Sequence, residues 1–177
     1  MAVPARHDGP HAPGGPVDDG HPRPWGLLAA VAATVLALDQ LTKWWALEAL
    51  DDGPVHVGWT LDLSLTFNTG TAFSFGRDLG PVIGLVAVAV VLGLLRTRMA
   101  TSSPATATAV GLILGGALGN LADRAFRSGG EGFLGGAVVD FVDLNWWPVF
   151  NLADAAIVVG ALALVAFGWE ATERSRR

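Results

Sequence analysis

Apolar runs dominate this chain and are separated by short polar stretches, a pattern typical of a protein that crosses a membrane several times. A hydrocarbon core of about 30 Å needs roughly 20 apolar residues in a helix, and four of the runs approach that length. Pro104 stands at the start of the third run. Proline has no backbone N–H, and it is tolerated in the first turn of a helix because the N–H groups there have no acceptor within the helix. The pattern predicts an all-α membrane protein with four transmembrane helices, at about 25–47, 79–97, 104–123 and 151–169.

A different pattern lies between the first two predicted helices. Residues 60–67 alternate polar and apolar side chains without a break, which indicates a half-buried strand. Turn-forming residues follow at 68–70, and residues 72–75 can return as a second strand. We expect a small sheet on the outer membrane surface with its apolar face toward the membrane. Segment 145–150 holds two tryptophans and suits an interfacial anchor.

The two ends of the chain differ from this apolar body. Residues 1–23 are rich in Pro, Gly and His and have too few apolar side chains to pack, which predicts a disordered cytoplasmic tail. Residues 171–177 form a short basic cytoplasmic tail, so that the membrane domain covers 24–170. The first apolar run exceeds the usual length of a signal-peptide core and contains Asp39, so we expect a retained helix.

Composition agrees with a membrane protein and excludes several chemistries. Hydrophobic residues make up 51% of the chain, charged residues only 15%, and the mean hydropathy is +0.46. Cysteine is absent, which excludes disulfides, thiolate nucleophiles and thiolate metal sites. The net charge is −5, and no basic cluster indicates a nucleic-acid partner. If both termini are cytoplasmic, most of the 11 Lys and Arg residues lie on the cytoplasmic side, as the positive-inside rule requires.

Polar residues recur at one depth of this arrangement. Asp39 lies about 21 Å along the first predicted helix and Asn120 about 24 Å along the third, at 1.5 Å per residue. Asp154 follows Asn151 at the start of the fourth helix, and Asp140 precedes that helix in the external segment. Carboxylates in or beside membrane-spanning helices are unfavourable to bury, so each is a candidate functional residue. Separate parts of the chain thus bring polar groups to one level near the outer interface.

The residues at this level restrict the possible chemistry. Of the histidines only His56 lies near it, without an obvious serine nucleophile, and the chain has no HExxH zinc pattern. Two carboxylates that share one proton can act as base and acid in hydrolysis. A small proton-coupled transporter and a non-catalytic scaffold are the alternatives. A transporter would place its acids near the membrane midplane on a repeat. Another type of intramembrane aspartyl protease is also possible, but the sequence lacks a GxGD signature.

Five short motifs carry a resemblance to a known family. They are DQLTK at 39–43, NTGTAF at 68–73, GGALGNLADR at 115–124, VVDF at 138–141 and FNLAD at 150–154. Together they resemble the bacterial lipoprotein signal peptidases (signal peptidase II), which are membrane aspartyl proteases. The resemblance implies four transmembrane helices with cytoplasmic termini, a small external β-sheet or cradle, and an external loop or short helix.

The resemblance also implies an activity and its residues. The expected enzyme cleaves diacylglyceryl-modified prolipoproteins just before the lipidated cysteine, near the outer face of the bacterial cytoplasmic membrane. No cofactor or metal is implied, and the expected state is a monomer in contact with membrane lipid. Asp140 and Asp154 correspond to the catalytic dyad, whereas Asp143 has no counterpart and is expected to be solvated. The residues expected to bind substrate or support the dyad are Asp39, Lys43, Asn68, Gly70, Asn120, Asp123, Arg124 and Asn151.

Structural roles remain open for several of these residues. Asn151 and Asp154 fit a helix N-cap followed by an acid in the first turn, where the helix dipole favours negative charge. Asn120 and Arg124 could serve as contacts between helices and as an interface anchor. The small residues at 115–119 favour close helix packing over ligand binding.

Overall fold

The computed structural model describes residues 24–69, 103–129 and 132–175, together with the single residues 89, 92, 93 and 96. The predicted tail at 1–23 and the predicted strand at 72–75 lie outside the described residues. So does the helix predicted at 79–97, apart from those four single residues, which are helical.

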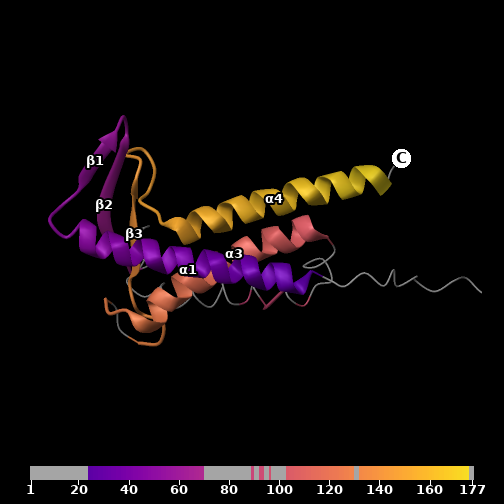
Figure 1. The fold of residues 1–177 in the computed structure, drawn as a ribbon, viewed down its shortest axis with the longest axis horizontal. Helices are drawn as coiled ribbons and strands as arrows, with labels where there is room; N and C mark the ends of the chain where they lie inside the picture. Colours follow the sequence, from indigo (N-terminus) through magenta and orange to yellow (C-terminus); the bar gives the residue numbers. More distant parts are fainter. Residues whose placement is uncertain are drawn as a thin grey trace, which may run out of the picture.

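Three long helices form the body of the described structure: α1 (Trp25–Ala49), α3 (Pro104–Phe126) and α4 (Leu152–Ser175). They lie side by side along the long axis, with α1 and α3 parallel and α4 antiparallel to both (Figure 1). The start of α1 and the end of α4 therefore lie at the same end of the molecule. These helices occur where the sequence predicts the first, third and fourth. Both α1 and α3 are long and apolar enough to cross a membrane, with a mean hydropathy of 1.5 each.

Local sequence explains where α3 begins and how closely it packs. Ser103 caps the helix by accepting a hydrogen bond from the Thr106 N–H at 3.1 Å, and proline follows at the first helical position. A Cβ atom on Gly115 would lie 2.6 Å from the Ala32 carbonyl oxygen of α1, and one on Gly116 would collide with the Ala153 carbonyl oxygen of α4. Small residues therefore let three backbones approach, as expected for membrane helices.

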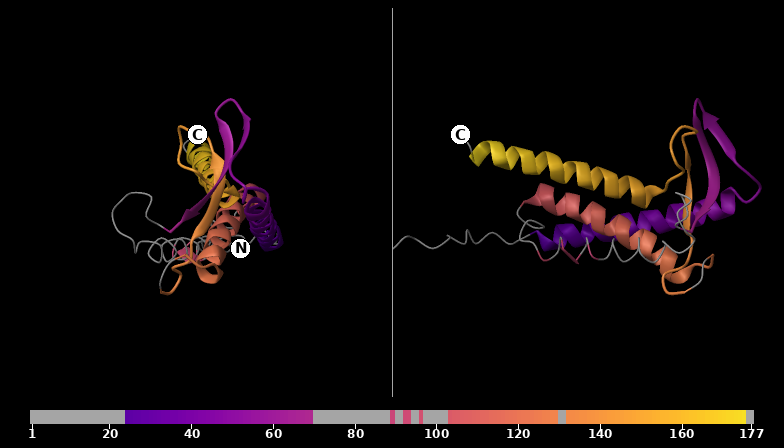
Figure 2. Two further views of the ribbon diagram at one scale, coloured as in Figure 1. Left: turned by 90° about the vertical axis from the view of Figure 1, so that its left-hand side faces the viewer. Right: turned by 180° about the vertical axis from the view of Figure 1, so that it is seen from behind.

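A three-stranded antiparallel sheet lies across one end of the helices, where α1 ends and α4 begins (Figure 2). Its order is β1 (Val55–Gly58), β2 (Leu61–Asn68) and β3 (Val138–Asp143). The strand predicted at 60–67 is confirmed as β2. Its described partners are two strands that the sequence pattern did not indicate, and the predicted partner at 72–75 lies outside the described residues.

The sheet is fixed to the helices through an apolar cluster. Ala46 and Leu50 at the end of α1 are buried with Phe141 of β3. Trp45 also contacts Phe141 edge to face, with ring centroids 6.3 Å apart. This packing buries the first four residues of β3, Val138 to Phe141, and brings Asp140 against the helix ends.

Candidate active site

Polar side chains from all three long helices and two strands meet where the sheet covers the helices. Isolated charges are strongly unfavourable in such a place, so each requires partners. Gly70 lies outside the described residues. The buried polar residues that the sequence predicted for the site are Asp39, Lys43, Asp123, Arg124, Asp140 and Asn151.

Asp140 projects from β3 into this region. It pairs with Thr66 across the sheet, and its side chain is almost fully buried. Its Oδ1 accepts a hydrogen bond from Asn151 Nδ2 at 2.6 Å, and its Oδ2 accepts one from Asn68 Nδ2 at 3.2 Å. Burial, and next the negative charge of Asp154, raise the pKa of Asp140 to about 6. The protonated form of Asp140 is therefore accessible near neutral pH.

Asp154 stands in the first turn of α4 and forms a reciprocal cap with Asn151. The Asp154 N–H donates to Asn151 Oδ1 at 2.9 Å, and the Asn151 N–H donates to Asp154 Oδ2 at 3.3 Å. The capping interpretation of this motif is therefore correct. The cap leaves the second carboxylate oxygen for another partner, because Asp154 Oδ1 accepts a hydrogen bond from Asn120 Nδ2 at 2.8 Å.

Asn151 connects the two carboxylates. Its main chain and side-chain oxygen bind Asp154, while its Nδ2 contacts Asp140 and also Asn120 Oδ1 at 3.1 Å. Both aspartates are therefore hydrogen-bonded to one fully buried residue. Two acids on different elements, β3 and α4, are thus brought into the same small region.

Lys43 of α1 binds three of the polar side chains in this region. Its ammonium group lies 2.9 Å from each of three oxygens, Asp39 Oδ2, Asp123 Oδ2 and Asn120 Oδ1. All three ammonium donors are therefore used. Because Lys43 binds the oxygen of the Asn120 amide, the NH₂ group of that amide is directed toward Asp154.

The two acids around Lys43 also join separate elements. Asp39 Oδ1 accepts from the Ala153 N–H of α4 at 3.0 Å, and Asp123 Oδ2 accepts from the Val139 N–H of β3 at 3.1 Å. Gly119 is required beside this cluster, since a Cβ there would collide with the Asp39 carboxylate. The acids thus fix the position of both segments that carry Asp140 and Asp154.

Two members of this cluster were not predicted from the sequence. Gln40 donates to Asp39, to the Gly119 carbonyl and to Asp123 at 3.1–3.2 Å. Arg127 Nε donates to Asp123 Oδ1 at 2.7 Å. The spacing of four residues between Asp123 and Arg127 on one helix is a signal that could have indicated the second contact.

Arg124 brings a further donor to the site. Its guanidinium is buried near the carboxylates of Asp140, Asp123 and Asp154. Among the described residues, its Nη1 has no hydrogen-bond partner. A buried donor without a partner is unfavourable by about 1–3 kcal/mol, more when charged, so a bound acceptor would be stabilised here.

Two residues of the sheet lie apart from this cluster. Asp143 is half-buried rather than solvated, because it accepts hydrogen bonds from the Asn145 N–H at 2.7 Å and from Ser64 Oγ at 3.3 Å. His56 is exposed and pairs with Asp62 at 2.5 Å. Hydrogen bonds from Asn145 and His56 lower the pKa of Asp62. Neither pair contacts Asp140 or Asp154 through a hydrogen bond that the structure describes.

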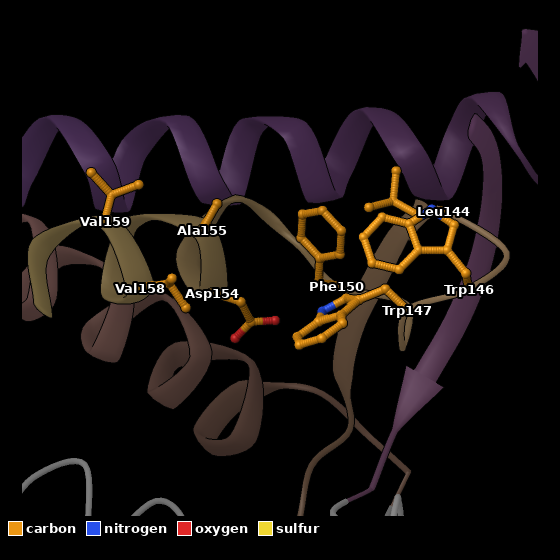
Figure 3. A pocket seen from close by; sticks show the side chains of 8 residues that line it. All are labelled: Leu144, Trp146, Trp147, Phe150, Asp154, Ala155, Val158 and Val159. Atoms are coloured by element: carbon orange, nitrogen blue, oxygen red, sulfur yellow. The ribbon is translucent and has the colours of Figure 1, made fainter. Parts of the chain in front are cut away.

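Beside Asp154 an apolar groove opens with a volume of about 410 Å³. Figure 3 shows the Asp154 carboxylate between Val158 on one side and the rings of Phe150 and Trp147 on the other. Among the described residues, no group of three His, Asp or Glu side chains is arranged to hold a metal ion.

Comparison with known proteins assigns the chain to a family. A family model described as signal peptidase (SPase) II matches residues 31–169. The chain belongs to the signal peptidase II family. A lipoprotein signal peptidase from Mycobacterium avium (strain 104) is 46% identical over 164 residues, which cover 90% of this chain and 89% of that protein. Another from Rhodococcus jostii (strain RHA1) is 48% identical over 141 residues, which cover 78% and 70%.

Two solved structures of bacterial membrane enzymes, both obtained by the in meso method, share the fold. One has a TM-score of 0.70 at 24% identity, and the match covers 84% of this chain and 91% of the other chain. The other has a TM-score of 0.68 at 25% identity and covers 80% and 91%. The protein is thus a bacterial membrane protein of the signal peptidase II family. For such a peptidase, the described site offers two neighbouring carboxylates, a free guanidinium nitrogen and an apolar groove.

Proposed function

We propose that this chain removes signal peptides from diacylglyceryl-modified prolipoproteins by cleaving just before the lipidated cysteine. The observation that carries the proposal is the joint hydrogen bonding of Asp140 and Asp154 to Asn151, within a chain of the signal peptidase II family. Membership in a peptidase family favours this function over the transporter alternative. The relatives named lipoprotein signal peptidase support the substrate class.

The two aspartates divide the acid and base roles. Asp140, whose pKa is raised to about 6, carries the shared proton. Asp154 lies at the positive end of the α4 dipole, which favours a carboxylate, and acts as the base. Asp154 takes a proton from water while the water oxygen bonds to the scissile carbonyl carbon, and Asp140 protonates the carbonyl oxygen.

The resulting neutral gem-diol collapses without an acyl-enzyme. The C–N bond breaks, Asp154 gives its proton to the leaving nitrogen, and a gem-diol hydroxyl returns a proton to Asp140. Arg124 Nη1 donates a hydrogen bond to a substrate carbonyl, which satisfies the donor that lacks a described partner. The signal peptide is extended and pairs with an edge of the sheet.

The proposed orientation places both termini in the cytoplasm and the sheet at the outer face. The distribution of Lys and Arg supports it. The ends of α1 and α4 remote from the sheet lie at the same end of the molecule, as this orientation requires (Figure 1). We further propose a monomer, because a single chain supplies both acids and the side chains that bind them, so the site needs no second copy to be complete.

A cleavage assay with purified protein in detergent tests the function. Two precursor peptides of the same sequence are compared, one with a diacylglyceryl group on cysteine and one without it. We expect cleavage of the lipidated peptide alone, with cysteine as the new N-terminus by mass spectrometry. No transmembrane gradient, metal or nucleotide is added. Equal cleavage of both peptides would contradict the proposed substrate, and no cleavage of either would contradict the proposed activity.

The protonation of Asp140 predicts a pH dependence. We expect kcat/KM to fall as the pH rises above about 6, because the free enzyme then loses the proton that the carbonyl requires. The hydrogen bond from Asn68 favours the charged form of Asp140 and lowers its pKa. In Asn68→Ala the decline should therefore move to higher pH. A kcat/KM profile that shows no such decline, or a shift to lower pH in the variant, would be inconsistent with Asp140 as the acid.

A further inference from the structure

The groove beside Asp154 has walls of two kinds. Its inner wall is one side of the first turns of α4, where Ala155, Val158 and Val159 follow Asp154 (Figure 3). Val159 lies about 7.5 Å along the helix from Asp154, at 1.5 Å per residue. The other wall is the segment between β3 and α4, which contributes Leu144, Trp146, Trp147 and Phe150.

The chemistry of these walls selects an apolar occupant. Asp154 is the only charged residue among the eight that line the groove. Val158 and Val159 are each 56% exposed, so the side of α4 that forms the groove faces away from the helix bundle. Trp146 and Trp147 are also exposed, as is typical of rings at the level of lipid headgroups. The groove thus runs from the headgroup level along a lipid-accessible helix face.

The position of the groove ties it to the reaction. The lipidated cysteine follows the scissile bond directly, so its glyceryl group must lie within a few bonds of the two aspartates. An acyl chain attached there needs an apolar path that begins at this point. Asp154 lies in the wall of the groove, and the part that extends from it along Val158 and Val159 is such a path.

The size of the groove limits what it can hold. Sites for small molecules have volumes of about 300–1,000 Å³. At about 410 Å³ the groove is near the lower limit of that range. We propose that it holds one acyl chain of the substrate's diacylglyceryl group, against Val158 and Val159, and thereby positions the scissile bond at the aspartates. This inference rests on the proposed function and adds a binding site that determines acyl-chain specificity.

A bulky side chain in the groove tests the proposal. Two lipidated precursor peptides differ only in acyl length, one short-chain and one long-chain, and kcat/KM is measured for each. In Val158→Phe, the ratio of long-chain to short-chain kcat/KM should fall about tenfold, a usual effect of losing apolar pocket contacts. The matched control is Leu162→Phe, one turn further along the same helix, where the side chain is 65% exposed and outside the groove. Its ratio should equal that of the wild type.

The outcomes separate the inference from the function on which it rests. An unchanged ratio in an active Val158→Phe variant overturns the acyl site while the peptidase function stands. The absence of any cleavage by the wild type overturns the function, and the acyl site falls with it. A drop of the same size in Leu162→Phe also overturns the site, because it would show a general effect of bulk on the lipid-facing side.

A labelling experiment locates the chain without a bulky variant. The long-chain peptide carries a photoreactive group on one acyl chain and is bound to Asp140→Asn, which keeps it uncut. Labels on 155–159 or on Trp147, found by mass spectrometry, support the site, and labels confined to other segments overturn it. A phospholipid with the same photoreactive chain is the second arm. If it labels these positions equally in the presence of the bound lipopeptide, the groove holds membrane lipid and the proposal is wrong.

Discussion

Asp140→Asn and Asp154→Asn should each lower the rate of prolipoprotein cleavage by about 10³-fold or more, the scale of lost general acid–base catalysis. Asparagine has nearly the shape of aspartate and can still accept hydrogen bonds through its oxygen. Each carboxylate accepts on both oxygens, so asparagine keeps one of the two hydrogen bonds, the contact from Asn68 at 140 or the α4 cap at 154, and turns an NH₂ group toward the other donor. The loss of activity should therefore be mainly chemical, with a smaller loss of stability. Single-turnover cleavage of the lipidated peptide, with melting curves in detergent, separates these causes.

The same strand offers the matched control for this experiment. Asp143 lies three residues beyond Asp140 on β3, is half-buried and binds Ser64 and Asn145 instead of the dyad. Asp143→Asn should cleave at a rate close to that of the wild type. Substantial cleavage by Asp140→Asn or Asp154→Asn, or an equal loss in Asp143→Asn, would argue against the proposed pair of acids.

Lys43→Met should destabilise the folded protein by about 3–5 kcal/mol, since removing one partner of a buried ion pair leaves charge uncompensated. Here the single ammonium group faces both Asp39 and Asp123, and none of the three side chains is exposed. Loss of Lys43 also frees the Asn120 oxygen, so the amide that faces Asp154 loses its fixed orientation. Thermal unfolding in detergent would measure the first effect, and cleavage below the unfolding temperature the second.

Arg127 provides the comparison for Lys43 because it binds the same carboxylate. Its side chain is 26% exposed, and Asp123 keeps Lys43 and Gln40 when Arg127 is removed. Arg127→Met should therefore change stability by about 1 kcal/mol or less. The double variant Asp39→Asn/Lys43→Met should recover part of the stability lost in Lys43→Met, because one unpaired charge is removed. Equal stability of Lys43→Met and Arg127→Met would show that the burial of Lys43 does not increase its contribution to stability.

Long apolar runs were sufficient to predict the described helices closely. The observed α1 ends two residues beyond the predicted boundary, and α3 begins at Pro104 as expected. Proline and an N-cap serine mark that start in the sequence itself. The end of α4 is less distinct, because polar residues follow the apolar run without a break and the helix continues to Ser175.

The sheet was only partly predictable, for a physical reason. Strand β2 is half-buried, and its polar and apolar residues alternate. The first four residues of β3 are all buried, so its polar and apolar residues do not alternate. The pairing of Asn68 with Val138 also joins segments far apart in the chain. No local turn signal indicates such a partner, so β3 could not be predicted as a neighbour of β2.

The sequence indicated most residues of the candidate site, but it did not indicate the hydrogen bonds and ion pairs that join them. The motifs indicated Asp39, Lys43 and Asp123 as supporting residues, and the spacing of the first two on one helix predicts their contact. Nothing in the sequence showed that one ammonium group would bind both acids and also orient Asn120. Such contacts depend on three helices meeting at one depth, which only the folded arrangement reveals.

Asn151 caps the start of α4 and also holds Asp140, so one residue serves both the start of a helix and the reactive pair. Asn151 and Ala153 are fully buried, and Asp39 binds the Ala153 N–H, so this helix start has none of the exposed contacts that let a helix end fray easily. On heating, loss of cleavage activity should therefore coincide with melting of the helix bundle.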